Sequence, residues 1–263
     1  MIEIESLEVT YGRGTALETR ALQGIDLRVA EAEFVTVIGS NGAGKSTLLN
    51  ALTGDAMPER GRIAIDGQDV TLWPATARAS LIARVFQDPL AGSCEALSIE
   101  ENLALAAARG RRRRLGLALT RALRGRFRDR LARLGLGLEQ RLGDRMGLLS
   151  GGQRQAVSLL MATLAPMKIL LLDEHTAALD PKTAEFVLEL TREIVAEQRL
   201  TTLMVTHSMR QALDCGTRTV MLHEGRICLD VAGPARAGLE VVDLVARFGE
   251  VHGRLETDSL LLG

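Results

Sequence analysis

Two short stretches of the chain combine residue types that can do chemistry. The first is GSNGAGKST, residues 39–47, and the second is the carboxylate pair Asp173 and Glu174, which follows the apolar run ILLL. Glycines around a lysine and hydroxyl residues allow the backbone to wrap closely around an anion. Ionised carboxylates at the end of a buried apolar strand are costly to desolvate unless a cation meets them. The two stretches therefore predict an anion cradle and an acidic group with a cationic partner.

The first stretch matches the phosphate-loop pattern GxxxxGK[ST], between an apolar run and a helix-forming segment. In this pattern the loop N–H groups and the helix N-terminus hold phosphate, Lys45 reaches the terminal phosphates, and the Ser46 hydroxyl can ligate Mg²⁺. A chance match in a chain of this length is on the order of one per cent from average residue usage. We expect the phosphates of a nucleotide and Mg²⁺ as ligands, with these loop residues: Gly39, Ser40, Asn41, Gly42, Ala43, Gly44, Lys45, Ser46 and Thr47.

The second stretch supplies the acidic groups that this chemistry needs. A strand-end aspartate holds Mg²⁺ directly or through water, and Asp173 fits that task. Glu174 is then left to polarise the attacking water. Taken alone, the pair is equally compatible with an acidic strand end that caps the next turn, because such ends are common in α/β folds. The phosphate loop upstream favours the metal and base roles.

A third motif lies at 149–153, where LSGGQ precedes the apolar-periodic segment RQAVSLLMATLA. Ser150 can cap the helix that this periodicity predicts, and the two glycines leave room for close approach. The motif therefore predicts a second helix N-terminus suited to a phosphate. For SGG alone, a capped helix after a glycine turn is the simpler interpretation.

LSGGQ between a phosphate loop and a DE strand resembles the arrangement of ATP-binding cassette (ABC) proteins, and the resemblance covers nearly the whole chain. It implies that the signature helix of one subunit covers the γ-phosphate held by the loop of the other, in a head-to-tail dimer with two sandwiched ATP molecules. By this resemblance four residues act in trans: Ser150, Gly151, Gly152 and Gln153.

The same resemblance assigns roles to further residues. Gln87, in RVFQDP, is similar to the glutamine that reaches Mg²⁺ and the attacking water and senses the transport partner. His207, after TTLMVT, resembles the switch histidine that contacts the γ-phosphate. Asp180, in AALD, matches the loop that connects the two ATP sites. Without the family, Gln87 is most simply a polar loop residue, and a lone strand-end histidine is most simply a satisfied polar group.

Two positions stay open. Tyr11 resembles the aromatic residue that stacks on adenine, a contact worth about 1 to 3 kcal/mol for bases in general, but it is equally compatible with an edge-strand tyrosine. His175 stands where most cassettes carry proline after the glutamate, so the path of that turn is undetermined.

The element pattern predicts an α/β protein, with a P-loop NTPase (RecA-like) core, a small antiparallel β layer and an inserted α-helical subdomain. The strand-like runs IEIESLEVTY and GRIAIDG are expected to form the antiparallel layer, and KILLLD, TTLMVTH and TVMLHEG to be buried parallel strands. We expect a single ABC ATPase domain over 1–263. Its parts are a nucleotide-binding core (1–87 and 150–235), a helical subdomain presenting the signature (88–149), and a C-terminal helix and tail (236–263).

Composition bounds the location and the partners. With 46% hydrophobic and 25% charged residues the chain is ordinary for a globular protein, and it contains neither a signal peptide nor an apolar run of the roughly 20 residues that span a bilayer. Three scattered cysteines suit a reducing compartment. By composition we expect a soluble cytoplasmic chain. The resemblance to ABC transporters implies a peripheral protein on the cytoplasmic face of the inner membrane, with its membrane-spanning part on another chain.

An arginine-dense segment spans 109–133 in a chain whose net charge is only −1. We favour a solvated or internally paired helix face. The alternatives are contact with a permease or anionic lipid headgroups, and contact with nucleic acid. We expect no nucleic-acid partner, because Phe127 is the one aromatic residue there that could stack on bases.

The sequence thus predicts the ATP-hydrolysing subunit of a multisubunit transporter that powers a separate permease through ATP-driven dimer closure. Resemblance favours an importer of a small solute such as an amino acid, with an extracytoplasmic solute-binding protein as a further partner. The alternatives are a soluble assembly ATPase of the iron–sulfur type, an exporter ATPase, and a regulatory nucleotide-binding module with little turnover. The transported substrate and the permease are not encoded in this chain.

Overall fold

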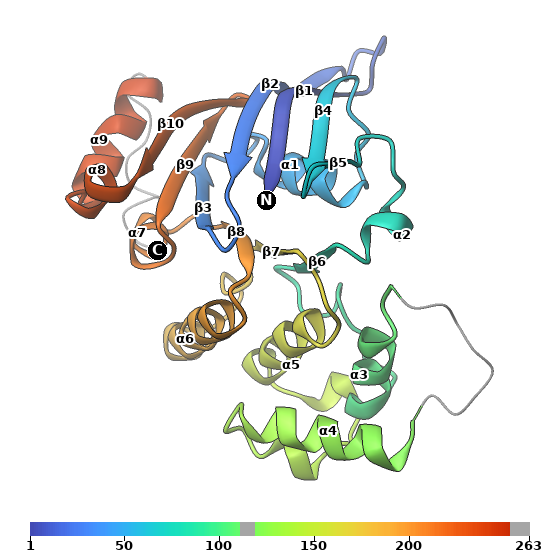
Figure 1. The fold of residues 1–263 in the computed structure, drawn as a ribbon. Coiled ribbons are helices and arrows are strands. Elements are labelled where there is room, and N and C mark those ends of the chain that lie inside the picture. Colours follow the sequence, from blue (N-terminus) through green and yellow to red (C-terminus); the bar gives the residue numbers. More distant parts are fainter. Residues whose placement is uncertain (111–118, 253–263) are drawn as a thin grey trace. The chain divides into compact units, whose positions relative to one another are not determined.

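The computed structural model describes residues 1–110 and 119–252, which form two compact units (Figure 1). Unit 1 comprises Met1–Arg78 together with the chain from Arg199 onward, and unit 2 comprises Ala79–Gln198. The arginine run at 111–114 and the last eleven residues, 253–263, lie outside the described residues. No helix in the described part of the chain is long and apolar enough to cross a membrane.

Unit 1 contains the predicted antiparallel sheet. Its strands are β1 (Ile2–Tyr11), β2 (Thr19–Val29), β4 (Arg60–Ile65) and β5 (Gln68–Asp69), in the order β2-β1-β4-β5 (Figure 1). Alternate residues of β1, such as Ile2 and Ile4, are buried, as expected for a sheet with one solvated face. The pairing of Ile2 with Ile65 confirms that the two runs flanking the phosphate loop share one sheet.

Unit 1 also contains the strands that carry the phosphate loop. These are β3 (Phe34–Gly39), β8 (Thr201–Val205), β9 (Arg218–His223) and β10 (Arg226–Ala232), in the order β10-β9-β3-β8. Strands β8 and β9 run parallel to β3, and every residue of β3 and β8 is buried. The apolar runs predicted to be buried parallel strands are therefore confirmed for β8 and β9.

The helices of unit 1 are α1 (Lys45–Thr53), α2 (Ala75–Arg78), α7 (Met209–Asp214), α8 (Gly233–Ala237) and α9 (Val241–His252). The terminal amphipathic helix is confirmed, because Leu244 and Phe248 of α9 belong to one buried cluster with Ile38, Met209 and Met221. The helix thereby completes the apolar core of this unit on the side of β3 and β9.

Unit 2 holds a parallel strand pair and most of the helical chain. Strand β6 (Ile82–Val85) pairs with β7 (Ile169–Asp173) in parallel. The helices are α3 (Ile99–Ala107), α4 (Arg121–Ala132), α5 (Gly151–Thr163) and α6 (Pro181–Gln198), with short 3₁₀ turns η1 (Leu138–Gln140) and η2 (Met146–Leu148). Between 88 and 149 the described residues form helices and turns, as the sequence predicts.

Three buried or part-buried arginines close the ends of helices. Arg78, which is fully buried, donates to two carbonyls at the end of α1 and to Thr71 O in the segment between β5 and α2. Arg109 donates to Ala162 O at the end of α5, and Arg236 donates to carbonyls at the end of α7. The last carbonyls of a helix have no partner within it, so these guanidinium groups satisfy them.

Candidate active site

The phosphate loop follows the buried strand β3 and requires glycine at both ends. Gly39 has φ +151° and Gly44 has φ +103°, a region that residues with a Cβ rarely adopt. A Cβ on Gly39 would lie 2.3 Å from Leu222 O, and one on Gly44 would lie 2.6 Å from Ala21 O. The loop is therefore packed against the neighbouring backbone, and its shape depends on these two glycines.

Lys45 and the start of α1 give the loop its positive character. The buried Lys45 Nζ donates to Gly39 O at 2.8 Å and to Ser40 O at 3.0 Å, so the ammonium group is drawn into the loop. Helix α1 has no side-chain cap and no acidic residue in its first turn. Its first N–H groups and the helix dipole are thus not offset by any side chain of the helix, and Ser46 beside them is exposed. This is the arrangement that binds phosphate.

His207 lies at the same edge of the sheet as the phosphate loop. Val205, the last residue of β8, pairs with Val37 of β3, and both chains leave the sheet within two residues. The turn after β8 is fixed by Thr206, which donates its hydroxyl to Gln211 Oε1 at 2.9 Å. Half-buried His207 sits in this turn before α7. The structure thus places the phosphate loop and His207 at the same edge of the sheet in unit 1.

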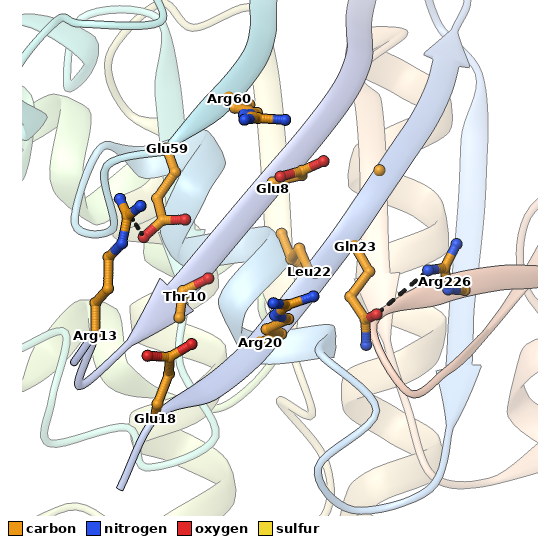
Figure 2. Close-up of a pocket in the computed structure, with 11 residues that line it drawn as sticks. Glu8, Thr10, Arg13, Glu18, Arg20, Leu22, Gln23, Glu59, Arg60 and Arg226 are labelled. Carbon is orange, nitrogen blue, oxygen red and sulfur yellow. Dashed lines mark hydrogen bonds and ion pairs between the residues drawn. The ribbon is translucent and has the colours of Figure 1, made fainter. Parts of the chain in front are cut away.

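Tyr11 lies at the end of β1, with 43% of the residue exposed. A hollow of about 550 Å³ lies on this sheet, and Figure 2 shows the residues that line it. Charged side chains from neighbouring strands and loops line it, among them Glu8, Arg20 and Arg60. Neither Tyr11 nor a residue of the phosphate loop is among its lining residues, so the hollow does not extend the nucleotide site.

In unit 2, Asp173 meets a cation that the sequence analysis missed. Arg84 Nη2 lies 2.5 Å from Asp173 Oδ2. Arg84 pairs with Leu171 across the parallel ladder, so Arg84 and Asp173 share one face of the two strands. The sequence predicted Mg²⁺ as the cation that meets this carboxylate, and among the described residues Arg84 pairs with it. The register of β6 against β7, which decides this, is not visible in the sequence.

Glu174 and His175 form a fixed turn after β7. Glu174 has φ +47°, an uncommon conformation for a residue with a side chain, and its carbonyl accepts from Ala177 N at 2.9 Å. His175, at the position where cassettes usually carry proline, is buried and its Nε2 lies 3.0 Å from Thr191 Oγ1 on α6. Burial lowers the pKa of His175 to about 4. The ring is therefore neutral at pH 7, and it ties the turn to α6.

The signature residues cap the N-terminus of α5. Ser150 Oγ accepts from Gln153 N at 3.3 Å, and Gln153 Oε1 accepts from Ser150 N at 3.2 Å, which confirms the predicted cap. Gly152 is buried, and a Cβ there would lie 2.0 Å from Thr183 Cγ2 of α6. One signature glycine thus serves the packing of α5 on α6, whereas Gly151 is exposed.

The other two predicted residues of unit 2 lie in turns. Asp180 precedes α6 and accepts from Thr183 N at 3.2 Å, and hydrogen bonds from Thr183 lower the pKa of its carboxyl group. Gln87 is exposed two residues beyond the end of β6. The preceding carbonyl, Phe86 O, accepts from Gln155 Nε2 of α5 at 3.2 Å. The signature helix and the chain before Gln87 are therefore directly linked.

The side chains predicted to hold Mg²⁺ are a carboxylate, a hydroxyl and an amide, which are the hard oxygen donors that this ion prefers. Among the described residues no cluster of three or more His, Cys, Asp or Glu side chains could hold a metal by itself.

Comparison with known proteins decides the family. The family profile described as ABC transporter matches residues 22–177, more than half of the chain, and this range contains the phosphate loop, the signature and the DE pair. The chain belongs to the ABC transporter family. This cassette is an ABC ATPase, as the sequence predicted.

The curated relatives cover from three quarters of the cassette to almost its full length. It is 40% identical to a protein of Clostridioides difficile (strain R20291) named tyrosine transport ATP-binding protein, over 94% of this chain and 98% of that one. It is 36% identical to a lipoprotein-releasing system ATP-binding protein of Caulobacter vibrioides, over 89% of this chain and 97% of that one. A thiamine import ATP-binding protein of Salmonella typhimurium is 37% identical, over 76% of this chain and 80% of that one.

Solved cassettes confirm the fold. A dimeric post-hydrolysis state of the ATP-binding cassette MJ0796, bound to ADP and Pi, is 29% identical, with a TM-score of 0.75 over 88% of this chain and 98% of that one. The protein cbiO1 from Clostridium perfringens, part of the ABC transporter complex cbiONQ, is 26% identical, with a TM-score of 0.75 over 95% of this chain and 94% of that one. The cassette is therefore the ATP-binding subunit of an ABC transporter with the α/β P-loop fold.

Proposed function

We propose that this cassette hydrolyses ATP to power an importer of a small solute such as an amino acid. The observation that carries the proposal is the 40% identity, over nearly the full length of both chains, to a protein named for tyrosine transport. The thiamine import relative supports the same direction of transport. The chain itself supplies the energy conversion, and the solute is selected by other chains.

The proposed roles follow the chemistry of each residue. Lys45 and the loop N–H groups bind the phosphates, and Tyr11 stacks on the adenine. Glu174 accepts the proton of the attacking water, and its left-handed backbone fixes where the carboxylate leaves the chain. His207 contacts the γ-phosphate from the turn after β8. The signature residues Ser150, Gly151, Gly152 and Gln153, with Asp180, act on the nucleotide of a partner subunit.

Ser46, Gln87 and Asp173 are the proposed Mg²⁺ ligands. When bound, the ion neutralises charge on the phosphate oxygens. Asp173 is the last residue of β7, and a carboxylate at a strand end supports this proposed role.

The partners are a second copy of the cassette and a separate permease. ATP binding closes a head-to-tail dimer and hydrolysis reopens it, and this two-state cycle drives the permease from the cytoplasmic face of the membrane. The dimeric state of a cassette with 29% identity supports this arrangement. An extracytoplasmic solute-binding protein is the further partner that an importer needs.

The first experiment is affinity purification of a tagged cassette from mildly solubilised membranes of its own host, followed by mass spectrometry. We expect a multi-spanning permease, with an extracytoplasmic binding protein bound or encoded nearby. Uptake of labelled tyrosine, tryptophan and phenylalanine is then compared between cells with the wild-type cassette and cells with Lys45→Ala. Unchanged uptake of every amino acid tested would contradict the amino-acid assignment.

The leading alternative is export, and the relative from a lipoprotein-releasing system favours it. A permease recovered without any solute-binding protein, together with a surface protein or lipid that accumulates in Lys45→Ala cells, would support export. Recovery only with soluble scaffold proteins would instead support an assembly ATPase.

A further inference from the structure

Arg84 and Asp173 form an enclosed ion pair in unit 2. Their side chains are only 11% and 14% exposed, and Arg84 Nη2 lies 2.5 Å from Asp173 Oδ2. A carboxylate this far removed from water needs a cation close by, because its lost hydration is otherwise not offset. Arg84 supplies this cation to Asp173 when no other cation is bound there.

The guanidinium group also contacts an aromatic ring. Its centre lies 4.8 Å from the centroid of the Phe86 ring, a cation–π distance. The backbone of Phe86 is fixed in turn by Gln155, a fully buried residue of α5. Arg84 therefore has a defined position in which it faces Asp173, and this position depends on the signature helix.

The same carboxylate is the proposed Mg²⁺ ligand. Mg²⁺ binds carboxylate oxygens at about 2.0 to 2.1 Å and requires near-ideal octahedral geometry. If the ion took either oxygen of Asp173, it would share one carboxylate with a guanidinium group in a site with little water. Two cations at that separation repel strongly where the effective dielectric constant is low. Arg84 and the metal therefore oppose each other at Asp173.

We propose that Arg84 is a positioning residue that competes with Mg²⁺ for Asp173. In the absence of metal and nucleotide it neutralises the carboxylate and keeps it in place; when the metal nucleotide binds, the guanidinium withdraws from Oδ2. The inference rests on the proposed role of Asp173 as a metal ligand. It adds a residue that sets the metal affinity without touching the nucleotide.

The test measures how much a metal ion strengthens nucleotide binding. Affinity for a non-hydrolysable ATP analogue is measured by calorimetry in EDTA and in Mn²⁺, and the number of bound Mn²⁺ ions is followed by electron paramagnetic resonance. With Arg84→Met, we expect the gain in affinity caused by Mn²⁺ to be about tenfold larger than in the wild type, the size expected for a lost charge-assisted hydrogen bond. Arg84→Lys keeps the charge but loses the planar fork, so its gain should lie between the two.

The matched control is Arg124→Met. Arg124 also pairs with a carboxylate of unit 2, Glu100, at 2.8 Å, but no predicted site residue is involved. Mn²⁺ should raise the nucleotide affinity of Arg124→Met as much as that of the wild type. In EDTA without nucleotide, the melting temperature of Arg84→Met should fall because a buried carboxylate is left unpaired, and Mn²⁺ with the analogue should raise it more than in the wild type.

The outcomes separate this inference from the proposed function. An unchanged or smaller metal-dependent gain in Arg84→Met would overturn the competition and make Arg84 a residue that only orients Asp173. If Arg84→Met does not fold, Arg84→Lys decides. The competition is overturned if Mn²⁺ raises the nucleotide affinity of Arg84→Lys no more than that of the wild type. If Mn²⁺ still raises the nucleotide affinity of Asp173→Asn as much as that of the wild type, Asp173 is not a metal ligand. The premise of the competition then fails.

Discussion

His175 Nε2 lies 3.0 Å from Thr191 Oγ1 in the interior of unit 2. The Thr191 hydroxyl donates its single proton to Val187 O at 2.7 Å, so it accepts the hydrogen bond from His175 Nε2–H. The turn after Glu174 is thereby attached to the middle of α6 by a neutral imidazole. This attachment stands at the position where most cassettes carry proline, a residue that restricts the backbone by its fixed φ.

The buried imidazole predicts a loss of stability in mild acid. Burial lowers the pKa of His175 from 6.5 to about 4, so the unfolded chain binds a proton between these values that the folded chain does not. Stability therefore falls as the pH drops from 6.5 towards 4, by up to about 3 kcal/mol. Urea unfolding at several pH values should show this loss, and His175→Gln should lose less over the same window. Parallel pH profiles for the two proteins would contradict the prediction.

Glu174→Gln should bind ATP normally and hydrolyse it about 10² to 10⁴ times more slowly, because the carboxamide cannot take a proton from water. Turnover is measured by phosphate release and binding by calorimetry. The control is Glu185→Gln on the exposed side of α6, which should leave both unchanged. Near-normal hydrolysis by Glu174→Gln would mean that another group activates the water.

Arg78→Met should destabilise the protein by about 3 kcal/mol or more, since several carbonyls around the end of α1 lose their donor and each unsatisfied buried group costs about 1 to 3 kcal/mol. The bonds that are lost run to Ala51 O, Leu52 O, Thr71 O and Trp73 O. Denaturant midpoints measure the effect. Arg20→Met, at an exposed position of β2, is the control and should change the midpoint little. A small effect at Arg78 would show that water replaces the guanidinium.

Gly152→Ala should destabilise the packing of α5 on α6 by about 1 to 3 kcal/mol, because the new methyl group meets Thr183 Cγ2. Thr183→Ser removes that methyl group, so the double variant should recover most of the loss in thermal unfolding. Gly151→Ala is the matched control, because the nearest atom to its Cβ, Leu179 Cδ2, is 3.5 Å away. Equal losses in Gly152→Ala with and without Thr183→Ser would exclude this clash.

The local part of the fold and of the site could be predicted from the sequence because its causes are local. Glycine spacing around Lys45 specifies a loop, Ser150 with Gln153 specifies a helix cap, and apolar runs specify buried strands. The phosphate loop, the cap of α5 and the antiparallel sheet follow these patterns in the structure. The roles of the individual site residues are predictions, and Glu174→Gln and Asp173→Asn test two of them.

The sequence by itself determined the family, the phosphate loop and the position of the DE pair, since each depends on residues that are neighbours along the chain. Only the tertiary structure decided what those residues touch. The pairing of Asp173 with Arg84 depends on the register of β6 against β7, and the anchoring of His175 depends on how α6 packs beside the turn. Strand register and helix packing are set by the burial of many side chains together, so one short stretch of sequence does not reveal them.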